Sequence, residues 1–449
     1  MKRDVLDYLK EWKTDPKKKP ILLRGARQVG KSWLAREAGK EFENFVEINF
    51  EKNPELCSFF AGNLDPERIT NNLSNYLRQK IMPGKTLLFF DEIQSCPRAI
   101  LALRYFYEDY PQLHVISAGS LLEFELRKIS FPVGRVQFIY VYPLSFAEYL
   151  TAAGKHNLRE MLLENNFEPL PEALHNQLNR EMRNYTLIGG MPEVAANFLE
   201  HGELAKCLNI QTGLIETYRS DFHKYARRHQ VKYIRKVFEA VPVQLGNKFK
   251  YANVSRDIKS RELGDALEML EMAGIVYKVY HSSANGIPLR AEMDEKKFKV
   301  LFVDVGLAQR LLKADHKPLL LDPDISRIND GAIAELLTGL ELIAYQNFRE
   351  KPGIYYWHRE ARASNAEIDY AASMGGRIVP IEVKSGSKGK MRSLQVFMES
   401  KKSRFGVKVS GFNFSFFENV LTVPFYGLEA LMKRADGVRA AHPAHDEQA

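Results

Sequence analysis

Residues 21–32 read ILLRGARQVGKS, and this segment gives the clearest indication of how the N-terminal part of the chain folds. Its last eight residues fit the pattern G-x-x-x-x-G-K-[ST] at every fixed position. An apolar strand is expected before the loop, at 21–23, and a helix after it, at 33–40. A strand, a glycine-rich loop and a helix N-terminus together favour phosphate groups, because the loop amides point inward and the helix dipole attracts negative charge.

The loop is therefore predicted to bind a nucleoside triphosphate, and ATP with Mg²⁺ is the expected ligand. Gly25 and Gly30 let the backbone curl around the phosphates, Lys31 reaches the β- and γ-phosphates, and the Ser32 hydroxyl ligates Mg²⁺. The predicted nucleotide-binding residues of the loop are Gly25, Ala26, Arg27, Gln28, Val29, Gly30, Lys31 and Ser32. The alternative is a strand–turn–helix joint with incidental glycines.

An apolar strand at 86–90 ends in Asp91 and Glu92. Carboxylates at the C-terminal ends of parallel strands point into the crevice where such sheets bind ligands. We expect Asp91 to hold Mg²⁺ and Glu92 to activate the attacking water. The alternative is an acidic cap for the following helix.

Two further positions are candidates for contact with the phosphates. The strand at 113–117 runs into a Ser–Ala–Gly–Ser turn, where Ser117 or Ser120 could sense the γ-phosphate; turn chemistry alone also explains both serines. Arg135 precedes the last strand, at 136–141, and is a candidate for stabilising the charge on the transferring phosphoryl group, within its own chain or on a neighbouring subunit of a homo-oligomer. A surface arginine is the alternative.

Strand and helix patterns alternate over residues 1–150, which indicates an α/β fold with a parallel sheet. With the glycine loop after its first strand, this part is expected to be a P-loop NTPase domain. Residues 151–240 are expected to form a helical region. Residues 241–315 suggest a winged-helix-like domain, with short helices at 253–258 and 263–272 and strands at 275–280 and 298–303. A further α/β domain is expected at 325–434, and a disordered tail at 435–449.

The composition excludes several classes of protein. The chain has 449 residues, which implies two or three domains, and no apolar run long enough to span a membrane. Its N-terminus does not have the pattern of a signal peptide, and its three cysteines are widely spaced, so a cytoplasmic protein is expected. The formal net charge of +8 permits a polyanionic partner such as DNA.

The segment 367–386 reads EIDYAASMGGRIVPIEVKSG and predicts a hairpin that turns at Gly375 and Gly376. With a two-residue loop, Asp369 lies opposite Glu382 and Glu367 opposite Lys384, all on one face. Such acids beside a lysine suit a divalent cation, held by Asp369 and Glu382, with Lys384 as a catalytic residue. Glu335, in the helical pattern 331–342, could supply a further ligand. The alternative is an ion-pair ladder on a solvated face.

In these motifs, and in GRVQFIYVYPLSFAEYL and KVLFVDVGLAQ, the chain resembles AAA+-type ATPases of bacteria and archaea that join an N-terminal P-loop domain to a C-terminal uncharacterised domain. The resemblance spans nearly the whole chain. It implies a C-terminal fold similar to the PD-(D/E)xK restriction endonucleases, with Asp369 as the motif aspartate, Glu382 and Lys384 as its E-x-K, and Glu335 as its helical glutamate. Ile368 stands where the motif has proline.

Two functions follow as expectations. In the first, the chain is an ATPase and ATP-driven switch that binds DNA and controls a Mg²⁺-dependent nuclease. In the second, it is a signalling ATPase whose C-terminal domain is a catalytically inactive module that binds a partner or DNA. The basic stretch at 219–236 favours DNA, although a solvated helix face also explains it. No membrane association is expected.

Overall fold

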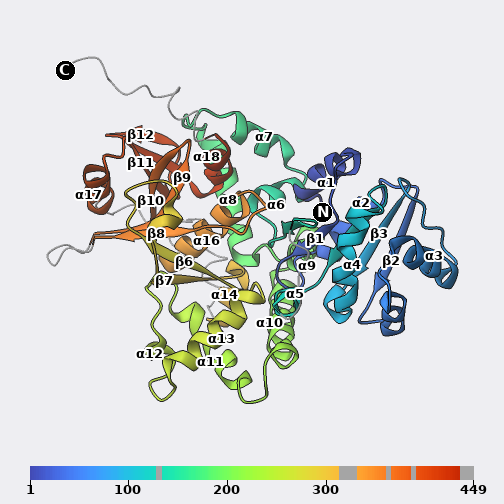
Figure 1. The fold of residues 1–449 in the computed structure, drawn as a ribbon. Coiled ribbons are helices and arrows are strands. Elements are labelled where there is room, and N and C mark those ends of the chain that lie inside the picture. The colour runs from blue at the N-terminus through green and yellow to red at the C-terminus, as the bar shows by residue number, and fades with distance from the viewer. Residues whose placement is uncertain (128–133, 313–330, 360–365, 386–390, 435–449) are drawn as a thin grey trace. The chain divides into compact units, whose positions relative to one another are not determined.

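The computed structural model describes residues 1–127, 134–312, 331–359, 366–385 and 391–434 (Figure 1). The predicted disordered tail therefore lies outside the described residues. The chain divides into two compact units. The first comprises residues 1–142, 272–274 and 347–351, and the second comprises 143–271, 275–346 and 352–449. No helix among the described residues combines the length and apolarity needed to cross a bilayer.

The first unit is built on a parallel sheet of five strands in the order β2-β3-β4-β1-β5. All four residues of β3's centre are fully buried, as expected for a strand with neighbours on both sides and helices on both faces. The strands are β1 (Ile21–Arg24), β2 (Asn44–Asn49), β3 (Thr86–Asp91), β4 (His114–Ala118) and β5 (Gln137–Tyr140). The helices are α1 (Val5–Thr14), α2 (Lys31–Gly39), α3 (Pro66–Leu77), α4 (Pro97–Glu108) and α5 (Leu122–Leu126), with short 3₁₀ turns at Pro54–Phe60 and Ile93–Ser95.

This order confirms the predicted parallel sheet and places its strand ends. Strand β4 lies between β1, which leads into the glycine loop, and β3, which ends in Asp91. All five strands run in the same direction, so the segments that follow β1, β3 and β4 meet at one edge of the sheet. Proline in the first turn of α3 and of α4 fixes where these helices begin.

The second unit begins with helices, as the sequence predicts. They are α6 (Phe146–Ala152), α7 (His156–Glu164), α8 (Glu172–Ile188), α9 (Pro192–His201), α10 (Leu204–Tyr225), α11 (Val231–Val243), α12 (Tyr251–Val254) and α13 (Ser260–Met272). Ser145 caps α6 in a capping box with Glu148, which shows how the sequence fixes a helix start in this region.

A mixed sheet of eight strands follows, in the order β12-β13-β11-β10-β9-β8-β6-β7. Its strands are β6 (Val276–Ser282), β7 (Met293–Phe302), β8 (Tyr355–His358), β9 (Glu367–Met374), β10 (Arg377–Lys384), β11 (Gly406–Ser410), β12 (Ser415–Phe417) and β13 (Val420–Pro424). The described helices that accompany them are α14 (Val305–Leu311), α16 (Gly331–Ala344), α17 (Arg392–Lys401) and α18 (Leu428–Arg434), with 3₁₀ turns at Leu289–Glu292 and Phe425–Gly427.

The winged-helix interpretation of residues 241–315 is not confirmed. Helix α13 and strands β6 and β7 match predicted elements, whereas the helix predicted at 253–258 is only the single turn α12, which ends at Val254. In addition, β6 pairs on one side with β7 and on the other with β8. The strands therefore belong to the same sheet as β8 to β13, and the predicted boundary between 241–315 and 325–434 separates strands of one sheet. The five-part division of the chain stays a prediction.

Candidate nucleotide site and carboxylate–lysine cluster

The glycine loop has the backbone that phosphate binding requires. Gly25 has a φ of +142°, and a Cβ there would lie 2.0 Å from the carbonyl oxygen of Val141, so only glycine fits. Gly30 has a φ of +93° and begins α2 without a side-chain cap. The backbone N–H groups in the first turn of α2 are therefore available to bind an anionic ligand. The Lys31 ammonium donates to the carbonyls of Gly25 (2.9 Å) and Ala26 (2.7 Å), at the inner side of the loop.

Ser32 and Asp91, the two predicted Mg²⁺ ligands of this site, are in contact. The Ser32 hydroxyl lies 3.1 Å from each carboxylate oxygen of Asp91. Asn49, which sequence reasoning missed, donates its amide to Asp91 at 3.2 Å. Asn49 ends β2 and is paired in register with Asp91, so the signal for it was the neighbouring strand end. Burial, followed by the charge of Glu92, raises the pKa of Asp91.

Glu92 is held in a left-handed conformation, with a φ of +48°. Its carboxylate accepts a hydrogen bond from Gln94 at 2.6 Å and a longer one from Ser120 at 3.4 Å. Gln94 was also missed, although it stands only two residues after Glu92. Ser117 is fully buried at the end of β4, and its hydroxyl has no hydrogen-bond partner in the described structure. Both serines predicted to sense the γ-phosphate therefore lie near Asp91 and Glu92, at the C-terminal ends of the strands. Ser120 is hydrogen-bonded to Glu92, whereas Ser117 is buried without a partner in the described structure.

Lys31 is a buried cation beside the glycine loop, at the C-terminal ends of the parallel strands. Burial lowers the pKa of its ammonium to about 8, against the opposing effect of Glu92 and Asp91. Bound phosphates would reverse this shift, because they place negative charge beside the ammonium. The uncapped helix start, the Ser32–Asp91 pair and the unpartnered Ser117 hydroxyl fit a nucleoside triphosphate with Mg²⁺. Gly25 to Ser32 would hold the phosphates, and Ser32 with Asp91 would hold the ion.

Arg135 is not brought to this site within its own unit. Gln137 pairs with Ile21, the first residue of β1, whereas the glycine loop follows Arg24, the last. Arg135 therefore lies at the N-terminal ends of the parallel strands, more than about 13 Å along the strand direction from the glycine loop. Its guanidinium pairs with Glu108 at 2.9 Å and its side chain is half exposed. The in-chain role is thus corrected, since the N-terminal end of a parallel strand points away from the crevice.

The predicted hairpin is present in the predicted register. β9 and β10 are antiparallel, Met374 pairs with Arg377, and the pairing continues without a bulge to Tyr370 and Ile381. Gly375 and Gly376 have φ values of +54° and +70°, as a two-residue turn requires. Beyond Tyr370 the Asp369 carboxylate accepts a hydrogen bond from the amide of Val383 at 2.8 Å.

Lys299, on β7, lies within this carboxylate cluster and was not predicted. Its side chain is only 2 % exposed. Its ammonium lies 2.8 Å from Glu335, 2.8 Å from Glu367 and 3.7 Å from Asp369. Burial lowers the pKa of Lys299, but the three carboxylates outweigh burial and the net shift is upward. The acids therefore do not form a fully solvated ladder, because the side chains of Glu335 and Asp369 are only 9 % and 19 % exposed.

Glu382 and Lys384 form a second pair in the cluster, at 2.5 Å. The other oxygen of Glu382 is buried without a hydrogen-bond partner in the described structure. Burial, then Asp369, raises the pKa of Glu382 to about 7, and burial raises that of Glu335 to about 7 against the effect of Lys299. Among the described residues no group of three or more His, Cys, Asp or Glu is placed to hold a metal ion. The predicted set of Asp369, Glu382 and Glu335 stays a prediction, and Glu335 is already bonded to Lys299.

Three protein families match successive parts of the chain. Residues 17–150 match an AAA domain, residues 179–317 a domain of unknown function (DUF8612) and residues 330–426 a domain of unknown function (DUF4143). The last match names no restriction-endonuclease-like fold. A comparison with curated proteins finds no match.

Three of the solved structures that match the chain are each less than 20% identical to it in sequence. A Walker-type ATPase of Pyrococcus abyssi is 18% identical, with 69% of this chain and 95% of that chain covered and a TM-score of 0.45. The RuvB Holliday junction branch migration motor of Thermotoga maritima is 14% identical, with 61% and 87% covered and a TM-score of 0.29. The Orc1 protein of Aeropyrum pernix, solved in complex with DNA, is 13% identical, with 71% and 92% covered and a TM-score of 0.22.

At these TM-scores the structural alignments establish no shared function. The family match to residues 17–150, the order of the parallel strands and the glycine loop agree with one another. The N-terminal part of the chain therefore has the P-loop ATPase fold of an AAA domain.

Proposed function

We propose that the chain is an ATP-hydrolysing switch whose second unit binds nucleic acid. The hydrolysis part rests on Glu92, which stands beside the Ser32–Asp91 pair at the carboxylate edge. A carboxylate held there can take a proton from water that attacks the γ-phosphate, while Lys31 balances the charge of the phosphates. Magnesium ion, when bound, would neutralise charge on the β- and γ-phosphates.

The nucleic-acid part rests on one observation, the distribution of charge. Residues 227–261 contain ten lysines and arginines and two acidic residues, a net charge of +8. The formal net charge of the whole chain is also +8, so the remaining residues are balanced. A segment of 35 residues thus carries the entire excess, and such a concentration of positive charge supports binding of a polyanion.

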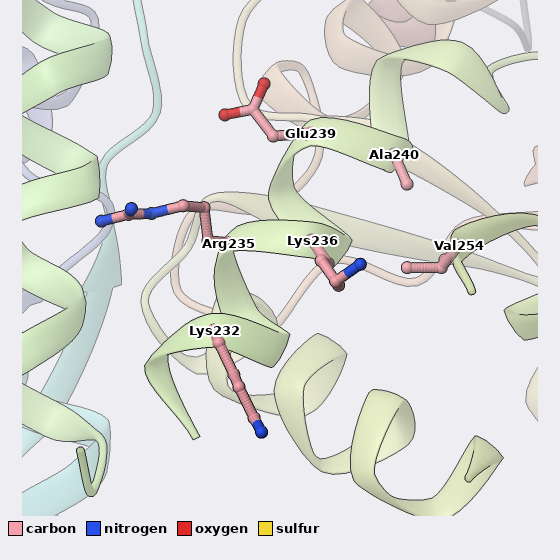
Figure 2. A pocket seen from close by; sticks show the side chains of 6 residues that line it. All are labelled: Lys232, Arg235, Lys236, Glu239, Ala240 and Val254. Atoms are coloured by element: carbon pink, nitrogen blue, oxygen red, sulfur yellow. The ribbon is translucent and has the colours of Figure 1, made fainter. Parts of the chain in front are cut away.

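Part of this excess lines a pocket between α11 and α12. The pocket has a volume of about 550 Å³ and is lined by Lys232, Arg235, Lys236, Glu239, Ala240 and Val254. Figure 2 shows the three basic side chains projecting from α11 and Val254 facing Lys236 from α12. Positions 232, 235 and 236 share one helix face. All three residues are exposed, and no ion pair involves them within the described part of the chain. We call this the α11 basic surface.

Fluorescence anisotropy with a labelled DNA duplex tests this surface. The triple variant Lys232→Glu, Arg235→Glu, Lys236→Glu should bind more than about tenfold more weakly than wild type, with a salt slope lower by roughly two to three. A matched control changes the same net charge elsewhere: Arg180→Glu, Lys296→Glu, Arg404→Glu, all exposed. Equal losses in both triple variants would mean that only overall charge matters, and the surface would have no specific role.

For the C-terminal cluster we weigh two functions. A Mg²⁺-dependent nuclease would use Asp369 and Glu382 as ligands and Lys384 beside the scissile phosphate. A non-catalytic binding module would need none of these roles, and the Lys299 contacts favour it, because they commit Glu335 and Glu367 to an internal ion pair. Incubation of plasmid DNA with the protein, Mg²⁺ or Mn²⁺ and ATP separates the two. Cleavage that Lys384→Ala abolishes would establish the nuclease.

A further inference from the structure

Lys299 is an unusual residue for its position. It lies in the strand segment FKVLF of β7, where its neighbours Phe298, Val300 and Leu301 are all buried. Lysine is almost never fully buried unless its charge is paired. A charge in such a place must be compensated by well-placed partners, since its desolvation costs several kcal/mol.

The partners come from two different elements. Glu335 projects from α16, and Glu367 and Asp369 project from β9. Their oxygens lie 2.8, 2.8 and 3.7 Å from the one ammonium. The ammonium also lies 5.4 Å from the centre of the Tyr356 ring, on β8, within the range of a cation–π contact. Three carboxylates and an aromatic ring thus enclose a single positive charge.

These distances match an ammonium rather than a divalent cation. Oxygen ligands lie about 2.0–2.6 Å from Mg²⁺ or Ca²⁺, so a metal would require the carboxylates to draw in and the ammonium to leave. The remaining acid of the cluster, Glu382, is paired with Lys384. Both halves of the cluster therefore contain a cation supplied by the chain itself.

We propose that Lys299 is the resident cation of this cluster, and that it takes the place a divalent metal would occupy among Glu335, Glu367 and Asp369. The ammonium ties β7 to α16 and β9 without a metal ion. The carboxylates of the cluster can bind a divalent metal ion only when the charge of Lys299 is removed.

Replacement of Lys299 by methionine tests this inference, because methionine has a similar length and no charge. Thermal melts and Mn²⁺ titrations followed by electron paramagnetic resonance are run on the full chain without nucleotide or DNA, so the P-loop does not contribute. Wild type should bind no Mn²⁺ in the millimolar range. The melting temperature of Lys299→Met should be at least about 5 °C lower than that of wild type. The variant should bind one Mn²⁺, and the bound ion should restore most of the lost melting temperature.

Lys278→Met is the matched control, since Lys278, on β6 beside β7, pairs in the described part of the chain with one carboxylate, that of Glu271 on α13, at 2.9 Å. It should lose stability without gaining Mn²⁺ binding. Mn²⁺ binding by wild type that disappears in Asp369→Asn would overturn the proposal. So would a Lys299→Met variant that folds and ignores Mn²⁺.

If Lys299→Met does not fold, the double variant Lys299→Met, Glu335→Gln decides the question. It removes one of the uncompensated carboxylates together with the ammonium, so it should fold and recover at least part of the lost melting temperature. Failure of the double variant to recover would mean that Lys299 acts through packing and not as a cation, which also overturns the proposal. None of these results depends on ATP hydrolysis or on the α11 basic surface.

Discussion

The hydroxyl of Ser32 lies 3.1 Å from both carboxylate oxygens of Asp91, which joins the glycine loop to the end of β3. The two residues are 59 positions apart in sequence, and the parallel sheet alone brings them together. A hydroxyl and a carboxylate at this distance can share one hard cation.

Asp91→Asn should therefore separate nucleotide affinity from its metal dependence. Asparagine keeps the shape of the side chain and removes its charge, so ATP without metal should bind as in wild type, and the gain on adding Mg²⁺ should shrink at least about tenfold. Isothermal titration with and without Mg²⁺ measures both. An unchanged gain would show that Asp91 only orients Ser32.

The lowered pKa of Lys31, about 8, gives a pH dependence with a defined sign. Below pH 8 the ammonium is charged before ATP arrives. Above pH 8 it is largely neutral in the free protein, and bound phosphates must recharge it, so binding takes up a proton and the affinity for ATP falls as pH rises. Titration at pH 8.5 in buffers of different ionisation enthalpy measures the uptake. Lys31→Arg, which stays charged, should show none.

Glu92→Gln should leave ATP binding intact and slow hydrolysis by roughly 10²-fold or more, the usual range for a general base. The volume is conserved and only the charge that accepts the proton is lost. Gln94 and Ser120 can still hydrogen-bond the new amide oxygen, so the local structure should persist. Phosphate release measures turnover. Hydrolysis at the wild-type rate would reduce Glu92 to a structural residue.

Arg135→Ala should not alter the ATP affinity of a single protomer, because Arg135 pairs with Glu108 at the far edge of the sheet. Should the arginine act on a neighbouring subunit, turnover per protomer would rise with protein concentration in wild type but not in the variant. A concentration series of both proteins resolves this. A loss of turnover at all concentrations together with lower ATP affinity would contradict the placement.

The sequence predicted those parts of the site that local patterns encode. The glycine loop, Asp91–Glu92 and the Gly375–Gly376 turn are each specified within a few residues, and all three lie where predicted. The role of Lys299 could not be predicted, because the sequence around a lone lysine in an apolar strand does not indicate that carboxylates of α16 and β9 lie next to it in the fold. The winged-helix interpretation failed to account for β8, whose pairing with β6 is long-range. The candidate role of Arg135 within its own chain failed because the direction of its strand was not considered.

ATP turnover by the purified chain, measured with and without a DNA duplex, tests the proposed nucleic-acid switch. Wild type should hydrolyse ATP with Mg²⁺, Lys31→Ala should fall to background, and the duplex should change the wild-type rate but not that of the α11 charge-reversal variant. Hydrolysis by Lys31→Ala at the wild-type rate would contradict the nucleotide site. If the duplex did not change the rate of ATP hydrolysis by wild type, the nucleic-acid switch would be contradicted. It would also be contradicted if the duplex changed the rate of the α11 charge-reversal variant as it changes that of wild type.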